Sequence, residues 1–393
     1  MRKEFLQFAP PLIGEEEIAE VVQTLREGWI TTGRRAQEFE ADFGRFVGAP
    51  AALAVNSATS AMHIALAALG IGEGDSVVST TMTFASSIHV IEHQRAHPVL
   101  VDVEPDTLNI DPNQVEAAVR RTPGVKAILP VHLYGHPADM RSIYEIAGRY
   151  GLAVIEDAAH ALPALHDGRL IGSPQPGFDF PNLVAFSFYA TKNLTTGEGG
   201  MLTGPPGLVD DARMWSLHGM SRDAFKRYTS EGSWRYDVVL PGFKYNMPDI
   251  QAAIGLHQLR RLDQMQHRRQ AIVAQYDEAL GPLEELETPV ERPGVQSAWH
   301  IYLLRLRPGR LKIDRAAFIE ELRARNIGAS VHFIPIHLHT YYRDRYQLRP
   351  EDFPIAQREF ERMLSLPLSP AHSDQDVADV IDAVTDIVRK HRA

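Results

Sequence analysis

The stretch SFYATKNLTTGEGGML, residues 187–202, follows an apolar, β-prone run and ends in a glycine-rich turn that enters another such run. A single lysine, Lys192, lies in the middle of it. In an open α/β sheet, ligands bind outside the carboxyl ends of the strands. Lys192 therefore falls where such a sheet places its functional side chains.

Short β-prone runs alternate with helical patterns between residues 50 and 205, which is typical of a mostly parallel sheet covered on both faces. Residues 57–70 predict a helix that Ser and Thr open and Gly70 closes, and residues 137–151 predict one capped by Asp139. Seven strands are expected, at residues 52–55, 76–80, 98–103, 126–133, 152–157, 183–188 and 199–204.

The pattern changes after residue 205. A polar stretch at 219–237 leads to one long helix expected from Pro248 to about Leu280. We expect residues 1–262 to form a large domain with the N-terminal segment, and residues 263–393 a smaller C-terminal α/β domain. The elements expected in the smaller domain are strands at 300–306 and 328–334, a helix after Asp314 and a terminal helix after Ser373.

Composition excludes several classes of protein. The chain has 393 residues, is 44% hydrophobic and carries a net charge of −10 without a basic stripe, so a nucleic-acid partner is not expected. No apolar run approaches the roughly 20 residues that span a bilayer, and no signal peptide is evident, so we expect a cytoplasmic protein without a membrane partner. The absence of cysteine removes disulfides, thiolate nucleophiles and Cys-ligated zinc.

Polar and aromatic residues follow several of the expected strands. The N–H groups and hydroxyls of residues 56–60 could cradle a phosphate at a helix N-terminus, or form an ordinary cap. Asp157 could pair with a cation or cap the next helix, and Phe84 could stack on a ligand or belong to the core.

Lys192 favours the functional interpretation of this set. A solvated surface lysine is the ordinary case, but a desolvated lysine has a lowered pKa and can form a Schiff base with an aldehyde. A Schiff-base lysine, a carboxylate for the pyridinium nitrogen, a phosphate cradle and an aromatic plate are what a pyridoxal phosphate site requires. All four fall at one edge of the expected sheet.

Histidine is abundant enough to raise the question of a metal. Zinc needs three or four converging ligands. Pro98 and Pro335 interrupt the two histidine groups, so we expect no metal site. The two groups are His89, His93 and His97, and His332, His337 and His339.

Five stretches together resemble the DegT/StrS-type sugar aminotransferases, in order and from about Pro11 to the last helix. They are VNSATSAMHIAL (55–66), VIEDAAHALPA (154–164), FSFYATKNLTTGEGGML (186–202), PGFKYNMPDIQAAIGLHQL (241–259) and SVHFIPIHLH (330–339). The resemblance implies a type I aminotransferase fold, a homodimer with shared active sites, and pyridoxal phosphate as cofactor. It also implies amino transfer from glutamate to a nucleotide-linked keto sugar, expected to be a 4-keto-6-deoxyhexose of a surface polysaccharide pathway.

The resemblance also assigns roles to residues. Lys192 becomes the Schiff-base lysine, Asp157 the partner of the pyridine nitrogen and His160 the neighbour of the cofactor's phenolic oxygen. Phe84 matches the residue that stacks on the ring. The positions that match the phosphate site are Ala58, Thr59, Ser60 and Ser187.

One motif departs from the family pattern. Where many members have G-Y-N-Y-R, with Asn reaching the partner subunit's phosphate, this chain has Gly242-Phe243-Lys244-Tyr245-Asn246. Either Lys244 or Asn246 could serve. The resemblance further suggests that His218, His332 and His337 line the sugar-nucleotide cleft, with packing or solvent exposure as the alternative.

Two other functions on the same fold stay open. Sugar dehydratases have histidine in place of the lysine, so Lys192 argues against a lyase. A cofactor-binding regulator would keep the site without turnover. A nicotinamide dehydrogenase is excluded because no G-x-G-x-x-G follows the first strand.

Overall fold

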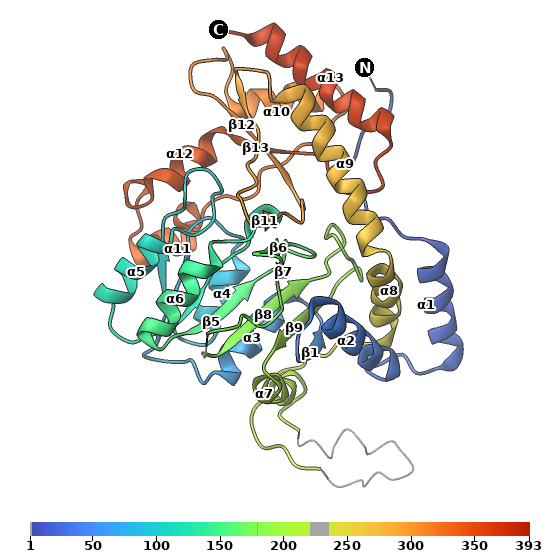
Figure 1. Cartoon of the computed structure of the whole chain (residues 1–393), viewed down its shortest axis with the longest axis vertical. Helices are drawn as coiled ribbons and strands as arrows, with labels where there is room; N and C mark the ends of the chain where they lie inside the picture. Colours follow the sequence, from blue (N-terminus) through green and yellow to red (C-terminus); the bar gives the residue numbers. More distant parts are fainter. Residues whose placement is uncertain (1, 179, 221–235) are drawn as a thin grey trace.

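A seven-stranded sheet forms the centre of the larger part of the molecule in the computed structural model, which describes residues 2–178, 180–220 and 236–393 (Figure 1). Its strand order is β1-β9-β8-β5-β4-β2-β3; β9 pairs antiparallel with β8 and β1, and the other pairs are parallel. All seven expected strands are confirmed. They are β1 (Ala51–Val55), β2 (Ser76–Thr80), β3 (His97–Val101), β4 (Val125–Leu129), β5 (Ala153–Asp157), β8 (Asn182–Ser187) and β9 (Gly200–Gly204).

Helices cover both faces of this sheet. One face packs against α3 (Ala58–Ala68), α4 (Ser86–His93) and α7 (Pro206–Ser216). The other packs against α5 (Pro112–Arg121) and α6 (Met140–Tyr150). Because successive strand side chains point to opposite faces, Val77 joins the first core and Val78 the second. The predicted caps are confirmed: Ser57 accepts from the Ser60 N–H, and Asp139 from the Ser142 N–H.

The N-terminal segment forms two helices that the sequence analysis did not predict, α1 (Glu15–Glu27) and α2 (Arg34–Val47). Both lie against α8 (Asp249–Arg260), as Figure 1 shows. Arg35 is buried and joins them by pairing with Glu20 and Glu27 at 2.8 and 2.6 Å.

The prediction of one helix from Pro248 to Leu280 is wrong. The chain forms α8 and then α9 (Leu262–Leu280), with Arg261 between them at φ −102° and ψ 1°. The guanidinium of Arg261 pairs with Glu17 and donates to the Leu12 carbonyl. Apolar spacing continues through Leu259 and Leu262, so the sequence pattern gave no sign of the break.

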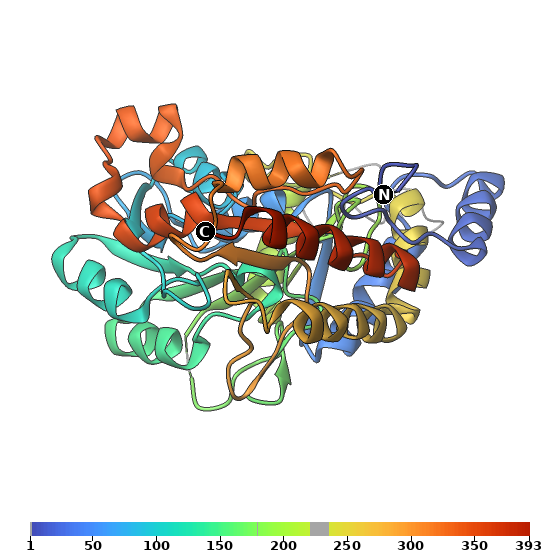
Figure 2. The ribbon, with the colours of Figure 1, turned by 90° about the horizontal axis from the view of Figure 1, so that it is seen from above.

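A second core lies around a three-stranded sheet, in the order β10-β12-β13. Figure 2 shows α13 between α9 and α10 on this side of the molecule. The expected strand at 300–306 and the helices after Asp314 and Ser373 are confirmed. The elements are β10 (Leu286–Glu287), β12 (Tyr302–Leu306), α10 (Arg315–Arg323), β13 (Met363–Leu366) and α13 (Asp374–His391).

The expected strand at residues 328–334 is wrong. This segment makes one isolated bridge, Ser330 with Ser365, next to another between Leu6 and Ile327, and β13 completes the sheet instead. Strand alternation fails here because two consecutive side chains, His332 and Phe333, both line one cavity instead of pointing to opposite faces of a sheet.

Short elements complete the chain. A three-stranded ribbon, in the order β11-β6-β7, joins the segment after β5 to the segment before β12. The remaining elements are β6 (Leu165–His166), β7 (Arg169–Leu170), β11 (Val295–Gln296), η1 (Leu133–Gly135), η3 (Ile336–Leu338), α11 (Thr340–Tyr346), η4 (Pro350–Asp352) and α12 (Pro354–Arg362).

Each core contains residues from the part of the chain that mainly builds the other. Leu6 from the N-terminal end enters the second core, and Ile301, Ile336 and Phe353 enter the first. The predicted domain boundary between residues 262 and 263 stays a prediction; it lies next to the break at Arg261.

Most of the polar stretch expected at 219–237 lies outside the described residues. No helix in the described ranges combines the length and apolar character needed to cross a membrane; the cytoplasmic location stays a prediction.

Candidate active site

A cavity of about 460 Å³ opens at the carboxyl ends of the parallel strands. Asp157 ends β5 and Ser187 ends β8, and both line it. The start of α3, the segment after β2 and the loop after β8 supply other walls, and the C-terminal part of the chain adds His300, His332 and Phe333. The volume suits a small-molecule ligand.

Lys192 lies in the loop between β8 and β9. Backbone bonds close the loop at its base, from the Phe188 N–H to the Gly199 carbonyl at 2.8 Å and from the Thr196 N–H to the Phe188 carbonyl at 2.9 Å. The amine has no hydrogen-bond partner among the described residues. Burial lowers the pKa of Lys192 to about 8, and the nearby charge of Asp157 opposes this shift.

Asp157 is 4% exposed, and its carboxylate is fixed from two directions. The buried hydroxyl of Ser87 donates to Oδ2 at 2.7 Å, and the Ala159 N–H donates to Oδ1 at 3.0 Å. Ser87 belongs to the first turn of α4 and also bonds Thr83 at 2.9 Å. The sequence analysis missed Ser87, since it considered only the residues that directly follow each strand.

The N-terminus of α3 forms another wall of the cavity. Ser57, Ala58 and Thr59 line the cavity, while Ser60 does not: its N–H donates to Ser57 Oγ at 3.1 Å and its hydroxyl to Asn56 Oδ1 at 2.5 Å. Gly200 lies directly behind this turn. A Cβ at Gly200 would be 2.5 Å from the carbonyl carbon of Ser57, so glycine permits the close approach of β9 to α3.

Aromatic rings surround the cavity. Phe84 is 60% exposed and its ring lies 5.6 Å from Phe333. Phe333 in turn stacks on His160, with centroids 5.6 Å apart and planes at 20°. An exposed ring at a cavity wall is available to stack on a planar ligand, as expected for Phe84.

His160 is held by the segment that follows β4. Its Nδ1 accepts a hydrogen bond from the Tyr134 N–H at 3.3 Å. Burial, with the charge of Lys192 nearby, holds the pKa of His160 well below its usual range. The imidazole is therefore neutral at physiological pH.

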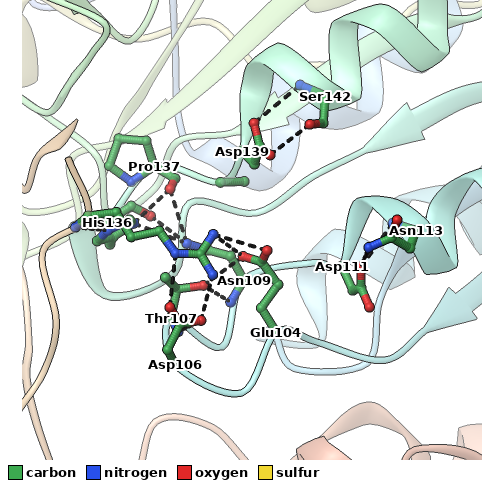
Figure 3. A network of polar contacts seen from close by, with 12 residues as sticks. Glu104, Asp106, Thr107, Asn109, Asp111, Asn113, His136, Pro137, Asp139 and Ser142 are labelled. Carbon is green, nitrogen blue, oxygen red and sulfur yellow. Dashed lines mark hydrogen bonds and ion pairs between the residues drawn. The ribbon is translucent and has the colours of Figure 1, made fainter. Parts of the chain in front are cut away.

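Polar contacts around Asn109 and His136 hold the segment that contains Tyr134 (Figure 3). Asn109 accepts from the Leu133 N–H at 2.8 Å and donates to the carbonyls of His136 and Pro137 at 2.9 and 3.2 Å. Arg292 closes the network by pairing with two carboxylates, Glu104 at 2.8 Å and Asp106 at 2.6 Å.

His332 and His300 also line the cavity. His332 bonds Ser365 Oγ through Nδ1 at 2.9 Å, and burial lowers the pKa of His332 to about 4. His300 was not predicted, because it begins its expected strand instead of following one. Its Nδ1 lies 3.1 Å from Oδ1 of Asn193, the residue next to Lys192.

The other predicted site residues do not meet at the cavity. The two ring nitrogens of buried His337 bond Thr81 and Gln357, and its ring stacks on Phe353, which leaves no nitrogen for a ligand. His218 is exposed and lies outside the cavity lining.

Lys244 and Asn246 lie beyond the cavity lining and contact each other. Lys244 is exposed, and the Asn246 amide donates to Thr32 Oγ1 at 2.6 Å. In the part of the chain that the structure describes, no three His, Cys, Asp or Glu side chains are arranged to bind a metal ion.

Comparison with known proteins identifies the family. The model of the DegT/DnrJ/EryC1/StrS aminotransferase family matches residues 11–385, so this chain belongs to that family. The Bacillus subtilis (strain 168) spore coat polysaccharide biosynthesis protein SpsC is 49% identical over 390 residues, which cover 99% of this chain and 98% of SpsC.

Two solved structures share the fold. The putative sugar aminotransferase Spr1654 from Streptococcus pneumoniae, in its PLP-form, has a TM-score of 0.89 at 33% identity, covering 98% of this chain and 99% of that one. DesV of S. venezuelae, in complex with a ketimine intermediate, has a TM-score of 0.84 at 35% identity, covering 95% and 94%. The expected family and the type I aminotransferase fold are thereby confirmed.

The close approach of Gly200 to α3 predicts a steric cost. Gly200→Ala should lower the free energy of unfolding by about 2 kcal/mol, because its methyl group must displace the backbone at Ser57 and Ala58. Gly148→Ala is the matched control: this α6 glycine has open space around a Cβ and should gain about 0.5–1 kcal/mol. Urea unfolding measures both, and equal effects would contradict the close approach.

Proposed function

We propose that this cavity transfers an amino group from glutamate to a nucleotide-linked keto sugar, with pyridoxal phosphate bound through Lys192. The observation that carries the proposal is the Lys192 amine, which has no hydrogen-bond partner in the described ranges and a pKa lowered to about 8, in one cavity with the fixed carboxylate of Asp157. Spr1654, a relative with the same fold, is known in a PLP-form and a PMP-form, which supports the choice of cofactor.

The residues present fit this cofactor. The unpartnered amine of Lys192 suits its aldehyde, and the fixed carboxylate of Asp157 suits a protonated ring nitrogen. The N–H groups at Ala58 and Thr59, with the hydroxyl of Ser187, suit its phosphate. Phe84 is free to cover one face of the ring.

When bound, pyridoxal phosphate supplies an aldehyde carbon that takes up the amino group and a ring that accepts electrons from the donor's Cα. Lys192 Nζ, released when the donor amine replaces it on the aldehyde carbon, would take the proton from that Cα and return it to the former aldehyde carbon. Asp157 keeps the ring nitrogen protonated. A lysine whose pKa lies near the working pH serves in both directions, since it is neither fully charged nor fully neutral.

The substrate assignment rests on relatives and on cavity chemistry. SpsC is named for polysaccharide biosynthesis, and Spr1654 is described as a putative sugar aminotransferase. A 4-keto-6-deoxyhexose is the expected acceptor. His332 adds a neutral polar group to the cavity, which suits a sugar better than a charged side chain would.

Two alternatives share the cofactor site. A sugar dehydratase of this fold is disfavoured because Lys192 stands where those relatives have histidine. A regulator that binds the cofactor without turnover would release no 2-oxoglutarate from glutamate, so product assay separates it from an enzyme.

The function is tested by the two half-reactions. Wild-type protein should convert glutamate to 2-oxoglutarate in the absence of sugar, and then aminate a nucleotide-linked 4-keto-6-deoxyhexose. Lys192→Ala should lose both activities by at least about a thousandfold, because the same amine would bond the aldehyde and move the proton. Mass spectrometry of the aminated sugar gives the readout. Turnover by Lys192→Ala at the wild-type rate would rule the proposal out.

The lowered pKa of Lys192 predicts how fast the cofactor-free protein bonds pyridoxal phosphate. Only the neutral amine attacks an aldehyde, so the rate should rise with pH up to about 8 and level off above it. An ordinary lysine, with a pKa of about 10.4, would keep gaining rate well beyond that point. Stopped-flow absorbance follows the reaction, with Lys192→Ala as the blank. A rate that keeps rising well above pH 8 would contradict the lowered pKa of the buried amine.

A homodimer with shared sites is part of the proposal. Helix α1 exposes an apolar strip, Ile18, Val22 and Leu25, which a second copy would cover. Lys244 and Asn246 lie outside their own subunit's cavity lining, as a residue that serves the neighbouring site would. The polar contact between them leaves open which one crosses.

Mixed dimers test this arrangement. Lys192→Ala and Asn246→Ala should each have low activity alone, but mixing should restore part of it, because the hybrid holds one site with both groups intact. Mixing Lys192→Ala with Lys244→Ala, in place of Asn246→Ala, shows which of the two residues reaches the partner's site. Failure of both mixtures, with subunit exchange demonstrated by mass, would mean that neither residue serves the partner's site.

A further inference from the structure

Two histidine rings lie against each other in the cavity. The centroids of His160 and His300 are 4.5 Å apart, and the rings are 7% and 6% exposed. Each ring uses Nδ1 in a bond to the protein. Within the described ranges, neither Nε2 has a hydrogen-bond partner and neither is fully buried. Both nitrogens are therefore open to the cavity that the two residues line.

The protein fixes which nitrogen of His160 carries the proton. Nδ1 accepts from the Tyr134 N–H, and a backbone amide can only donate. A neutral His160 therefore has its proton on Nε2, and it presents a donor to the cavity. This donor suits the neighbour of the cofactor's phenolic oxygen, the role expected for His160 from the sequence.

Asn193 fixes His300 in the opposite way. Its Nδ2 donates to the Ala298 carbonyl at 2.7 Å, which sets the orientation of the amide. Oδ1 therefore faces His300 Nδ1, at 3.1 Å, and can only accept. The proton of a neutral His300 is thus on Nδ1, and Nε2 presents a lone pair.

The surroundings keep His300 neutral. Burial holds the pKa of His300 well below its usual range, and the charges of Lys192 and Arg269, with the rings of His160 and His332, act in the same direction. Asn193 brings no charge of its own. An aspartate at this position would instead favour the protonated ring.

We propose that Asn193 is a positioning residue that holds His300 as a neutral hydrogen-bond acceptor opposite the donor of His160. Under the proposed function, on which this step rests, two groups that donate hydrogen bonds reach the cavity: the Lys192 amine and a hydroxyl of the sugar. His300 Nε2 would accept a hydrogen bond from one of them. Because Asn193 directly follows Lys192, one loop carries the reactive amine and sets the state of the facing histidine.

The first test measures the proton positions directly. Full-length protein with bound pyridoxal phosphate is labelled with ¹⁵N-histidine, and side-chain ¹⁵N shifts show which ring nitrogens are protonated. The signals of His300 are identified by their loss in His300→Phe. In wild type, His300 should carry its proton on Nδ1 and His160 on Nε2. A charged His300 at neutral pH, or a proton on its Nε2, would overturn the proposal.

Two variants of Asn193 sharpen this test. In Asn193→Leu, His300 should lose its fixed tautomer, whereas Asn193→Asp should keep the Nδ1 proton and raise the pH at which the ring titrates. Asn113→Leu, which alters an exposed amide far from the cavity, is the matched control and should change neither signal. An unchanged tautomer in Asn193→Leu would refute the role of Asn193. Asn193→Asp provides a second answer if the leucine variant does not fold.

Half-reactions then separate the two sources of the donor. If His300 accepts from Lys192, Asn193→Leu should slow both half-reactions by about tenfold, the effect of one lost hydrogen bond. If it accepts from the sugar, only the second half-reaction should slow. Unchanged rates of both half-reactions in Asn193→Leu would overturn the inference that the hydrogen bond accepted by His300 contributes to the reaction. The ¹⁵N measurement needs no sugar, so its outcome is independent of whether the proposed acceptor is correct.

Discussion

The site depends on an amine that is buried without a hydrogen-bond partner among the described residues, opposite a carboxylate that has its partners already. Burial disfavours the charge on Lys192 and brings its pKa to about 8, while Asp157 limits the shift. Since the hydroxyl of Ser87 and the N–H of Ala159 satisfy the carboxylate, Asp157 is held in place instead of collapsing onto the lysine. The amine is thus left available for chemistry.

Close packing gives the cavity its shape. Gly200 brings β9 against the first turn of α3, and the backbone bonds of the lysine loop close between Phe188 and Gly199. Outside the cavity lining, Asn109 holds the segment whose Tyr134 N–H binds His160. Asp157 and His160, which face the cavity, are thus held by Ser87 and Tyr134, which lie outside its lining, and such support keeps a site's geometry without a ligand.

The sequence by itself determined the sheet and the reactive core of the site. Buried strands read as continuous apolar runs, so all seven strands of the sheet could be located, and the strand-end rule selected Lys192, Asp157 and Phe84. Local caps, Ser57 and Asp139, were equally predictable, because a cap depends on residues three positions apart. These features follow from short-range chemistry that a single segment contains.

Tertiary structure decided the rest. At the break, Arg261 contacts Glu17 and Leu12 from the N-terminal segment, and within 328–334 the consecutive side chains His332 and Phe333 both line the cavity. His337 was expected at the site and His300 was not, and distant contacts reversed this. His337 bonds Thr81 in the interior, whereas His300 lies beside Asn193, which is far from it in the sequence. Apolar periodicity records which side of an element is buried, but it does not record which distant side chain will lie against it, and that contact sets the charge and orientation of a histidine.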